Sequence, residues 1–353
     1  MVFTMFTRRT FARLMGAASL APAASRAQSG KPLSRIAFGS CAKQTLPQPI
    51  WDPILAYRPD LFIFAGDNVY GDFHAPDAAD LKRAYEEAGH IAGYTKLLET
   101  VPHLAVWDDH DYGVNDGGVE FPHKALSKDL FLEFWKAPTN DIRRTRGGIY
   151  DSQIIGPPGK RVQVILLDVR WFRSPLRITD KRGAPGKQRY LPDPDPAKTM
   201  LGAEQWAWLA TELRKPAELR LIVSSTQVLA EGHGWERWGN LPLEKQKLVD
   251  TIRASGAKGV VFLSGDRHIG ALYRETPEGL YPLYEATSSG LNMVYWAAKE
   301  PGPNRLGPLF AAANFGVVEI DWAARKFLLA LRDERGDTRR AVDVGFDTLS
   351  IAT

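Results

Sequence analysis

The sequence contains very little cysteine, only a short apolar stretch near its N-terminus and no dense basic segment. Its single cysteine, Cys41, excludes a disulfide within the chain. Residues 14–24 are too few for the roughly 20 apolar residues that cross a bilayer, so we expect no stable membrane span. The formal net charge of +4 is not concentrated in a lysine and arginine cluster, and we predict no nucleic-acid partner.

The rest of the composition is that of a globular protein, with 44% hydrophobic and 24% charged residues among 353. This length allows a large core. Residues 7–13 form a twin-arginine pattern, and with residues 14–24 and a cleavage site at 25–27 they indicate that residues 1–27 are an export signal. A disordered basic tail is the alternative. We expect residues 28–34 to be a linker, and the twin-arginine export machinery to deliver the folded protein to the periplasm or outside the cell.

The most informative stretch is residues 104–116, where a short apolar strand ends in Asp108, Asp109, His110 and Asp111. Three carboxylates this close repel one another and raise one another's pKa unless a cation lies among them. A metal ion is the simplest such cation. A solvated acidic turn would explain the carboxylates, but it would not explain the strand before them or the histidine among them.

The same pattern of an apolar run followed by polar residues recurs along the chain. The polar segments that follow the apolar runs are residues 39–41, 66–70, 108–111, 168–170, 224–227 and 264–268. In α/β folds ligands collect at the carboxyl ends of strands, so we expect these six segments to form one site. Cys41 follows two small residues at the first strand end, which favours metal ligation over a buried, inert thiol.

Helical and strand periodicities alternate after the linker and predict layers around two sheets in one catalytic domain, residues 35–353. The predicted helices cover residues 49–57, 77–100, 124–136, 202–213 and 243–255. An alternating strand at residues 149–155 precedes a hairpin turn at 156–159, and residues 316–331 read as a second hairpin. We expect substrate choice to depend on the loops at residues 71–80, 173–198 and 230–242.

Three motifs resemble those of the PhoD-like (alkaline phosphatase D) family, a branch of the calcineurin-like metallophosphoesterases. They are Gly66-Asp67-Asn68-Val69-Tyr70, Trp107-Asp108-Asp109-His110-Asp111 and Gly265-Asp266-Arg267-His268. Shorter segments at residues 38–41, 168–170, 201–206 and 224–227 support the resemblance, which covers residues 35 to 290. It implies an α/β fold, a four-layer α/β/β/α sandwich of two mixed sheets with a metal centre between them.

The resemblance also implies a set of metal ligands. These are Cys41, Asp67, Tyr70, Asp109, Asp266 and His268, with Asn115 as an alternative to Asp109 and with Gln227 either at the second metal or in no contact with it. Family likeness implies ferric iron and calcium. Thiolate and phenolate suit a trivalent or soft ion, and carboxylate oxygens suit calcium or magnesium. Zinc, manganese and magnesium remain open.

The chemistry expected from this set is hydrolysis of phosphate esters by a metal-activated hydroxide. His110 would protonate the leaving alkoxide or stabilise charge on a non-bridging oxygen. Arg170 would fork onto the phosphoryl group, or else pair structurally with an acid. The expected function is therefore that of an exported metal-dependent phosphoesterase acting on small-molecule or lipid phosphate esters, either monoesters or diesters.

Two other functions stay open at this point. A metal-independent ester hydrolase could use Ser224 or Ser225, although the chain lacks a Gly-x-Ser-x-Gly motif. A non-catalytic periplasmic protein could bind phosphate-bearing ligands through the metal centre, although it would not need His110 as a proton donor. The remaining histidines are expected to be surface or packed side chains, with His233 as the exception because of its glycine-rich loop.

Overall fold

The computed structural model describes residues 30–350, which are built around two six-stranded sheets. The predicted export signal, residues 1–27, and the first two residues of the linker lie outside the described residues. Among the residues that the structure describes, no helix is long and apolar enough to span a bilayer.

The first sheet has the strand order β12-β11-β10-β1-β2-β3. Its strands are β1 (Arg35–Gly39), β2 (Leu61–Ala65), β3 (His103–Val106), β10 (Asn314–Asp321), β11 (Lys326–Asp333) and β12 (Thr338–Gly345). The first three are parallel, and the last three join β1 as an antiparallel meander. All five residues of β2 are buried and apolar, as expected for a parallel strand covered on both faces.

The second sheet has the order β4-β5-β6-β7-β9-β8. Its strands are β4 (Asp151–Ile155), β5 (Val162–Leu166), β6 (Leu219–Ser224), β7 (Val260–Ser264), β8 (Gly270–Glu275) and β9 (Leu283–Ser288). The four central strands β5, β6, β7 and β9 are parallel, and β4 and β8 are antiparallel edges. The hairpin turn expected at residues 156–159 joins β4 to β5.

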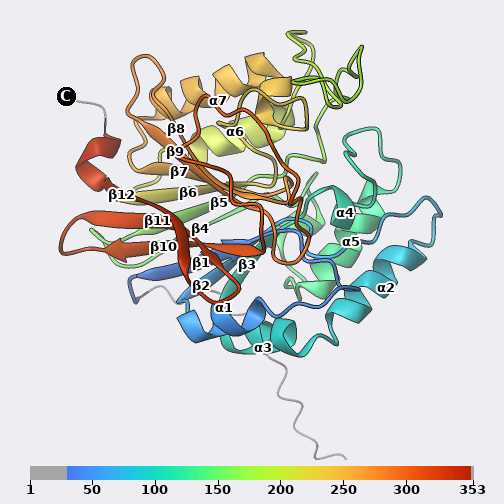
Figure 1. Ribbon diagram of the computed structural model, residues 1–353, viewed down its shortest axis with the longest axis horizontal. Coiled ribbons are helices and arrows are strands. Elements are labelled where there is room, and N and C mark those ends of the chain that lie inside the picture. The colour runs from blue at the N-terminus through green and yellow to red at the C-terminus, as the bar shows by residue number, and fades with distance from the viewer. Residues whose placement is uncertain (1–29, 351–353) are drawn as a thin grey trace, which may run out of the picture.

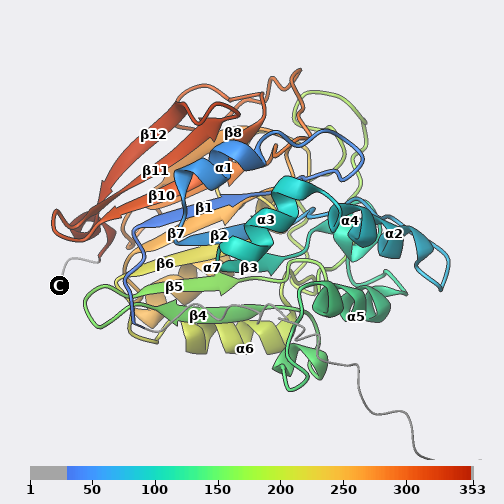
Figure 2. The same ribbon diagram turned by 90° about the horizontal axis from the view of Figure 1, so that it is seen from below.

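The helices cover the outer faces of the two sheets. They are α1 (Trp51–Tyr57), α2 (Ala79–Ala88), α3 (Ala92–Thr100), α4 (Asp109–Tyr112), α5 (Lys124–Phe134), α6 (Gly202–Glu212) and α7 (Pro242–Ser255), with 3-10 turns at Ile142–Arg144, Trp238–Asn240 and Phe346–Leu349. Figure 1 shows α6 and α7 above the second sheet and α1 and α3 below the first. Figure 2 shows α1 and α3 lying over the first sheet, with α2, α4 and α5 towards one end of it. The predicted four-layer α/β/β/α sandwich is confirmed.

Several predicted elements differ from the observed ones. The helix expected at residues 77–100 is two helices, because α2 ends at Ala88 and Ile91 has an extended backbone before α3. Strands β8 and β12 were not predicted. Both are edge strands. β12 exposes several polar side chains, and β8 has a short apolar part that starts with Gly270 and ends at Arg274 and Glu275.

Candidate metal centre

The carboxyl ends of four parallel strands deliver polar side chains to one region between the sheets. From the first sheet come Cys41 after β1, Asp67 after β2 and Asp109 after β3; from the second come Asp266 and His268 after β7. Four of these five have a left-handed backbone, with φ of 63° at Cys41, 49° at Asp67, 65° at Asp266 and 54° at His268. Non-glycine residues held in this region cluster at functional sites, which identifies these strand ends as specialised.

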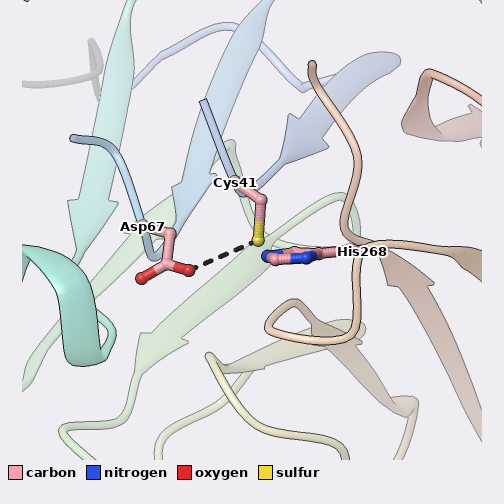
Figure 3. Close-up of side chains that lie close together, drawn as sticks. All are labelled: Cys41, Asp67 and His268. Atoms are coloured by element: carbon pink, nitrogen blue, oxygen red, sulfur yellow. Dashed lines mark hydrogen bonds between the residues drawn. The ribbon is translucent and has the colours of Figure 1, made fainter. Parts of the chain in front are cut away.

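Cys41, Asp67 and His268 form the first group of donors. One donor atom of each lies within 4.8 Å of those of the other two, and Figure 3 shows the three side chains converging from separate loops. The Cys41 Sγ is 3.5 Å from Asp67 Oδ2, and the Tyr70 hydroxyl is 3.0 Å from His268 Nε2. Burial raises the pKa of the Cys41 thiol to about 12. Without a cation this thiol stays protonated.

Two further donor groups continue the centre. Asp67, Asp109 and His110 form one, and Asp109, Asp116, Glu236 and Asp266 form the other. Asp67 and Asp109 each belong to two groups, so the three groups form one contiguous centre. Asp116 and Glu236 were not among the ligands expected from the sequence, although Asp116 ends the acidic stretch and Glu236 lies in the glycine-rich loop assigned to the substrate side.

The carboxylates of this centre fit a bound cation. Asp109 is 2% exposed, and its Oδ1 is buried with no hydrogen-bond partner, while Oδ2 accepts a bond of 2.7 Å from the Asp116 N–H. Burial and the charge of Asp108 raise the pKa of Asp266 well above its usual value. An unpaired buried oxygen among carboxylates is costly unless a positive charge lies beside it. The donors therefore fit metal ions, with thiol, phenol and imidazole at one end and oxygens alone at the other.

His110 lies at the edge of this centre. Its Nδ1 is 2.6 Å from Asp72 Oδ2, and its ring is tilted over that of Tyr70 at 4.3 Å between centroids. Burial lowers the pKa of His110, but the charges of Asp109, Asp67 and Asp72 outweigh it and raise the pKa to about 11. Because Nδ1 is hydrogen-bonded to Asp72, Nε2 is the ring nitrogen that is available for proton transfer.

Arg170 is buried between two carboxylates. Its side chain is fully buried, Nε donates to Asp108 Oδ1 at 2.7 Å, and NH1 lies 2.7 Å from Glu236 Oε2. Of the two roles expected for Arg170, the structure shows the pairing with acids. This pairing orients Glu236, one of the donors, and Asp108, the neighbour of Asp109.

Three other sequence expectations concern residues that the structure keeps apart from the donor groups. Asn115 is exposed, and the next residue, Asp116, supplies the carboxylate. Gln227 is fully buried and bonded to Tyr273, Thr287 and His233. Ser225 donates to Asp108 at 2.5 Å and Ser224 to a backbone carbonyl, and within residues 30–350 neither has a histidine partner to act as a base.

The sequence is similar to those of known proteins. The profile of the PhoD-like phosphatase family matches residues 36–297. Alkaline phosphatase D of Bacillus subtilis (strain 168) is 20% identical over 237 residues, which are 62% of this chain and 40% of that protein. The chain therefore matches less than half of the length of this relative.

Solved structures share the fold at low identity. A PhoD structure superposes with a TM-score of 0.67 at 15% identity, covering 91% of this chain and 71% of that one. Purple acid phosphatase PPD1 of yellow lupin gives 0.59 at 10% identity, covering 90% and 54%. GAP50 of Plasmodium, described as an anchor in the inner membrane complex, gives 0.56 at 13% identity, covering 92% and 90%. Because named phosphatases and a named anchor share the fold, activity has to be argued from the site.

Proposed function

The chain belongs to the PhoD-like phosphatase family, and we propose that it is a metal-dependent phosphoric ester hydrolase that is exported. The observation that carries the proposal is the contiguous set of three donor groups linked by Asp67 and Asp109. A protein that only anchors a partner has no need for a buried carboxylate oxygen without a donor at the centre of such a set.

The donor set suggests two kinds of metal ion. Cys41, Tyr70 and His268 offer soft or phenolic ligands that suit iron, and zinc is the alternative. Asp109, Asp116, Glu236 and Asp266 offer only oxygen, which suits calcium, with magnesium or manganese as alternatives. Bound ions would supply positive charge that makes water more acidic and stabilises the phosphoryl oxygens.

The chain's own residues have distinct tasks in this proposal. Asp67 and Asp109 each serve two donor groups and so fix the spacing between them. Asp72 holds Nδ1 of His110, so that Nε2 can deliver a proton to the leaving alkoxide. Arg170 holds Glu236 in place through the buried ion pair. The substrate class is small-molecule or lipid phosphate esters.

The parts of the proposal that concern export and the extent of the catalytic domain are based on the sequence. The twin-arginine pattern at residues 7–13 supports export of a folded protein, and residues 35–353 form the catalytic domain in this proposal. Changing Arg8 and Arg9 together to lysine should keep the protein in the cytoplasm of a host that has the twin-arginine machinery. Unchanged export of this double variant would contradict the proposal.

Hydrolysis of bis(p-nitrophenyl) phosphate and p-nitrophenyl phosphate tests the activity. Removal of metal with a chelator should abolish turnover, and Asp67→Asn should lower kcat by at least about 100-fold if transition-state charge stabilisation is lost. The exposed Asp343 provides a matched control, and Asp343→Asn should not change kcat. Elemental analysis of the exported protein identifies the ions, and an iron-phenolate absorption band should vanish in Tyr70→Phe.

Two outcomes would contradict this function. Full activity after thorough removal of metal would exclude the metal-dependent reaction. Tight binding of phosphate esters without turnover across a broad panel would instead indicate a ligand-binding protein.

A further inference from the structure

Near the metal centre, two loops and an aromatic segment border an open pocket of about 400 Å³. Its wall is formed mainly by Arg182, Arg189, Trp235, Tyr295, Lys299 and Glu300. The loop at residues 173–198 is hydrogen-bonded to the loop around Trp235. The backbone N–H groups of Arg189 and Tyr190 both donate to the Gly234 carbonyl at 2.8 Å. Two of the three loops that the sequence assigned to substrate choice therefore build one wall together.

Two contacts place the wall of the pocket next to the metal centre. Arg189 forms an ion pair with Asp116, a member of the oxygen-donor group. The Tyr295 N–H donates to the carbonyl of His268 at 2.8 Å. A phosphate ester with its phosphorus at the centre could therefore extend one of its substituents into this pocket.

The pocket has a net positive charge, because carboxylates neutralise only some of its cationic side chains. Glu300 is paired with Arg267, and Arg189 with Asp116. Across the part of the chain that the structure describes, neither Arg182 nor Lys299 forms an ion pair, and both side chains are exposed. A substituent carrying its own negative charge would meet two free cations here.

The pocket also offers an open aromatic surface. Trp235 is fixed by two guanidinium groups, with that of Arg189 5.3 Å and that of Arg267 4.8 Å from its ring centroid. Tyr295 packs edge-on against it at 6.5 Å and remains 40% exposed, and the adjoining Trp296 is 80% exposed. Large aromatic side chains left exposed beside a site are suited to stacking on a flat ring.

We propose that this pocket binds one substituent of a phosphodiester and selects a substituent that combines a flat aromatic ring with a further negative charge. Tyr295 supplies the stacking surface, and Arg182 and Lys299 supply the charge. This inference rests on the proposed phosphoesterase function and adds the substrate class to it.

Three diesters that share the p-nitrophenyl leaving group test the inference, with methyl, phenyl or 4-carboxyphenyl as the second substituent. Each kcat/KM is divided by the rate of hydroxide-catalysed hydrolysis, which removes differences in intrinsic reactivity. The normalised value should rise about 5- to 30-fold from methyl to phenyl, as expected for stacking of one ring. It should rise again by about 3- to 10-fold for 4-carboxyphenyl, and this second step should shrink at high salt because exposed charges are screened.

Variants separate the two contributions. Tyr295→Leu should remove most of the preference for phenyl over methyl, and Arg182→Gln combined with Lys299→Gln should remove the preference for 4-carboxyphenyl over phenyl. Arg335→Gln changes the same charge on an exposed side chain of the β11–β12 hairpin and should leave both preferences unchanged.

The results distinguish this inference from the function on which it rests. Hydrolysis of the methyl diester with equal normalised kcat/KM for all three substrates would overturn the pocket and leave the phosphoesterase function intact. If no diester is hydrolysed, the proposed function fails for diesters. Binding of the three compounds, measured by calorimetry, then tests whether the pocket selects the second substituent. Equal affinities overturn it, and affinities in the order methyl, phenyl, 4-carboxyphenyl support it.

Discussion

At the scale of single residues, Arg170 shows how a buried charge depends on its neighbours. It is fully buried between Asp108 and Glu236. Such a pair is weak evidence for net stability, but removing one partner leaves the other charge buried and uncompensated. The sequence placed Arg170 two residues after Asp168 and left two roles open, because a sequence does not show which acids lie opposite a guanidinium.

Replacing this arginine tests its role. Arg170→Met should lower the free energy of unfolding of the chelator-treated protein by about 3–5 kcal/mol, because two buried carboxylates lose their cation. Urea unfolding followed by circular dichroism measures the loss. Arg325→Met, at an exposed ion pair with Asp347, should change stability far less. Unchanged stability of Arg170→Met together with a raised KM would show instead that Arg170 contacts the phosphoryl group.

His233 gives a second residue-scale prediction, because its hydrogen bonds fix the neutral form. Nδ1 accepts from the Trp235 N–H at 3.2 Å, so Nε2 carries the proton and donates to Gln227 Oε1 at 3.0 Å. Burial and the charges of Arg267 and Arg237 lower the pKa of His233 well below its usual value of 6.5. Between the folded and unfolded pKa values, the unfolded chain therefore binds a proton that the folded protein does not bind.

Stability should consequently fall as the pH falls below about 6.5, by at most about 1.4 kcal/mol per pH unit from this histidine. Other groups titrate in the same range, so the informative quantity is the difference between wild type and His233→Gln. Chemical unfolding at pH 8 and pH 5.5 should show the variant losing less stability on acidification. Equal losses would show that His233 titrates with an ordinary pKa.

At the scale of elements, the strand ends require glycine where they approach one another. Gly66, between β2 and Asp67, has a φ of 105°, and a Cβ there would lie 2.7 Å from Asp108 Cβ and 2.8 Å from Ser225 Cβ. These neighbours follow β3 and β6, which belong to different sheets. The glycine therefore allows the two sheets to meet at the metal centre.

Gly66→Ala should destabilise the protein by about 2–5 kcal/mol, the sum of backbone strain at positive φ and overpacking. It should also lower kcat, because Asp67 follows directly. Gly159→Ala is the matched control: its φ is 86°, but no atom lies within 4 Å of the added Cβ, so only the strain of about 1–2 kcal/mol applies. Thermal melting and hydrolysis assays measure both variants. Similar losses of stability for the two, with full activity, would contradict the proposed close approach.

The elements also show how far sequence reasoning reaches. The apolar runs located the central strands and the polar residues at their ends, because both are local patterns. Asp116 and Glu236 were not found as donors, because distant partners place them. Tyr190 donates to Asp116 at 2.8 Å across 74 positions, and Arg170 and Arg173 hold Glu236. Such long-range pairs leave no periodic signal. The two edge strands β8 and β12 were missed for a different reason, because an edge strand need not be apolar throughout.

At the scale of the whole molecule, the donor groups connect two sheets that are also joined by apolar packing and by polar contacts such as Arg170 with Asp108. Cys41, Asp67 and Asp109 come from the first sheet, and Asp266 and His268 from the second. Without a cation, carboxylates from opposite sheets repel one another across the centre. With one, the same oxygens hold the sheets together, so bound metal should stabilise the entire fold and not only its loops.

Metal removal should therefore lower Tm by about 5–10 °C, as expected when a ligand bound about 1,000-fold above its Kd is lost from a chain of this size. Asp67→Asn should have opposite effects on Tm with and without metal, because burial and the charge of Asp109 raise the pKa of Asp67 well above its usual value. In loaded protein the variant should melt below wild type, because a shared ligand is lost; in stripped protein it should melt above wild type, because repulsion is relieved. Scanning calorimetry measures both, and amide hydrogen exchange should show faster exchange in β2 and β7 together after stripping. If exchange increased only in the loops and Tm stayed constant, the metal ions would not couple the two sheets.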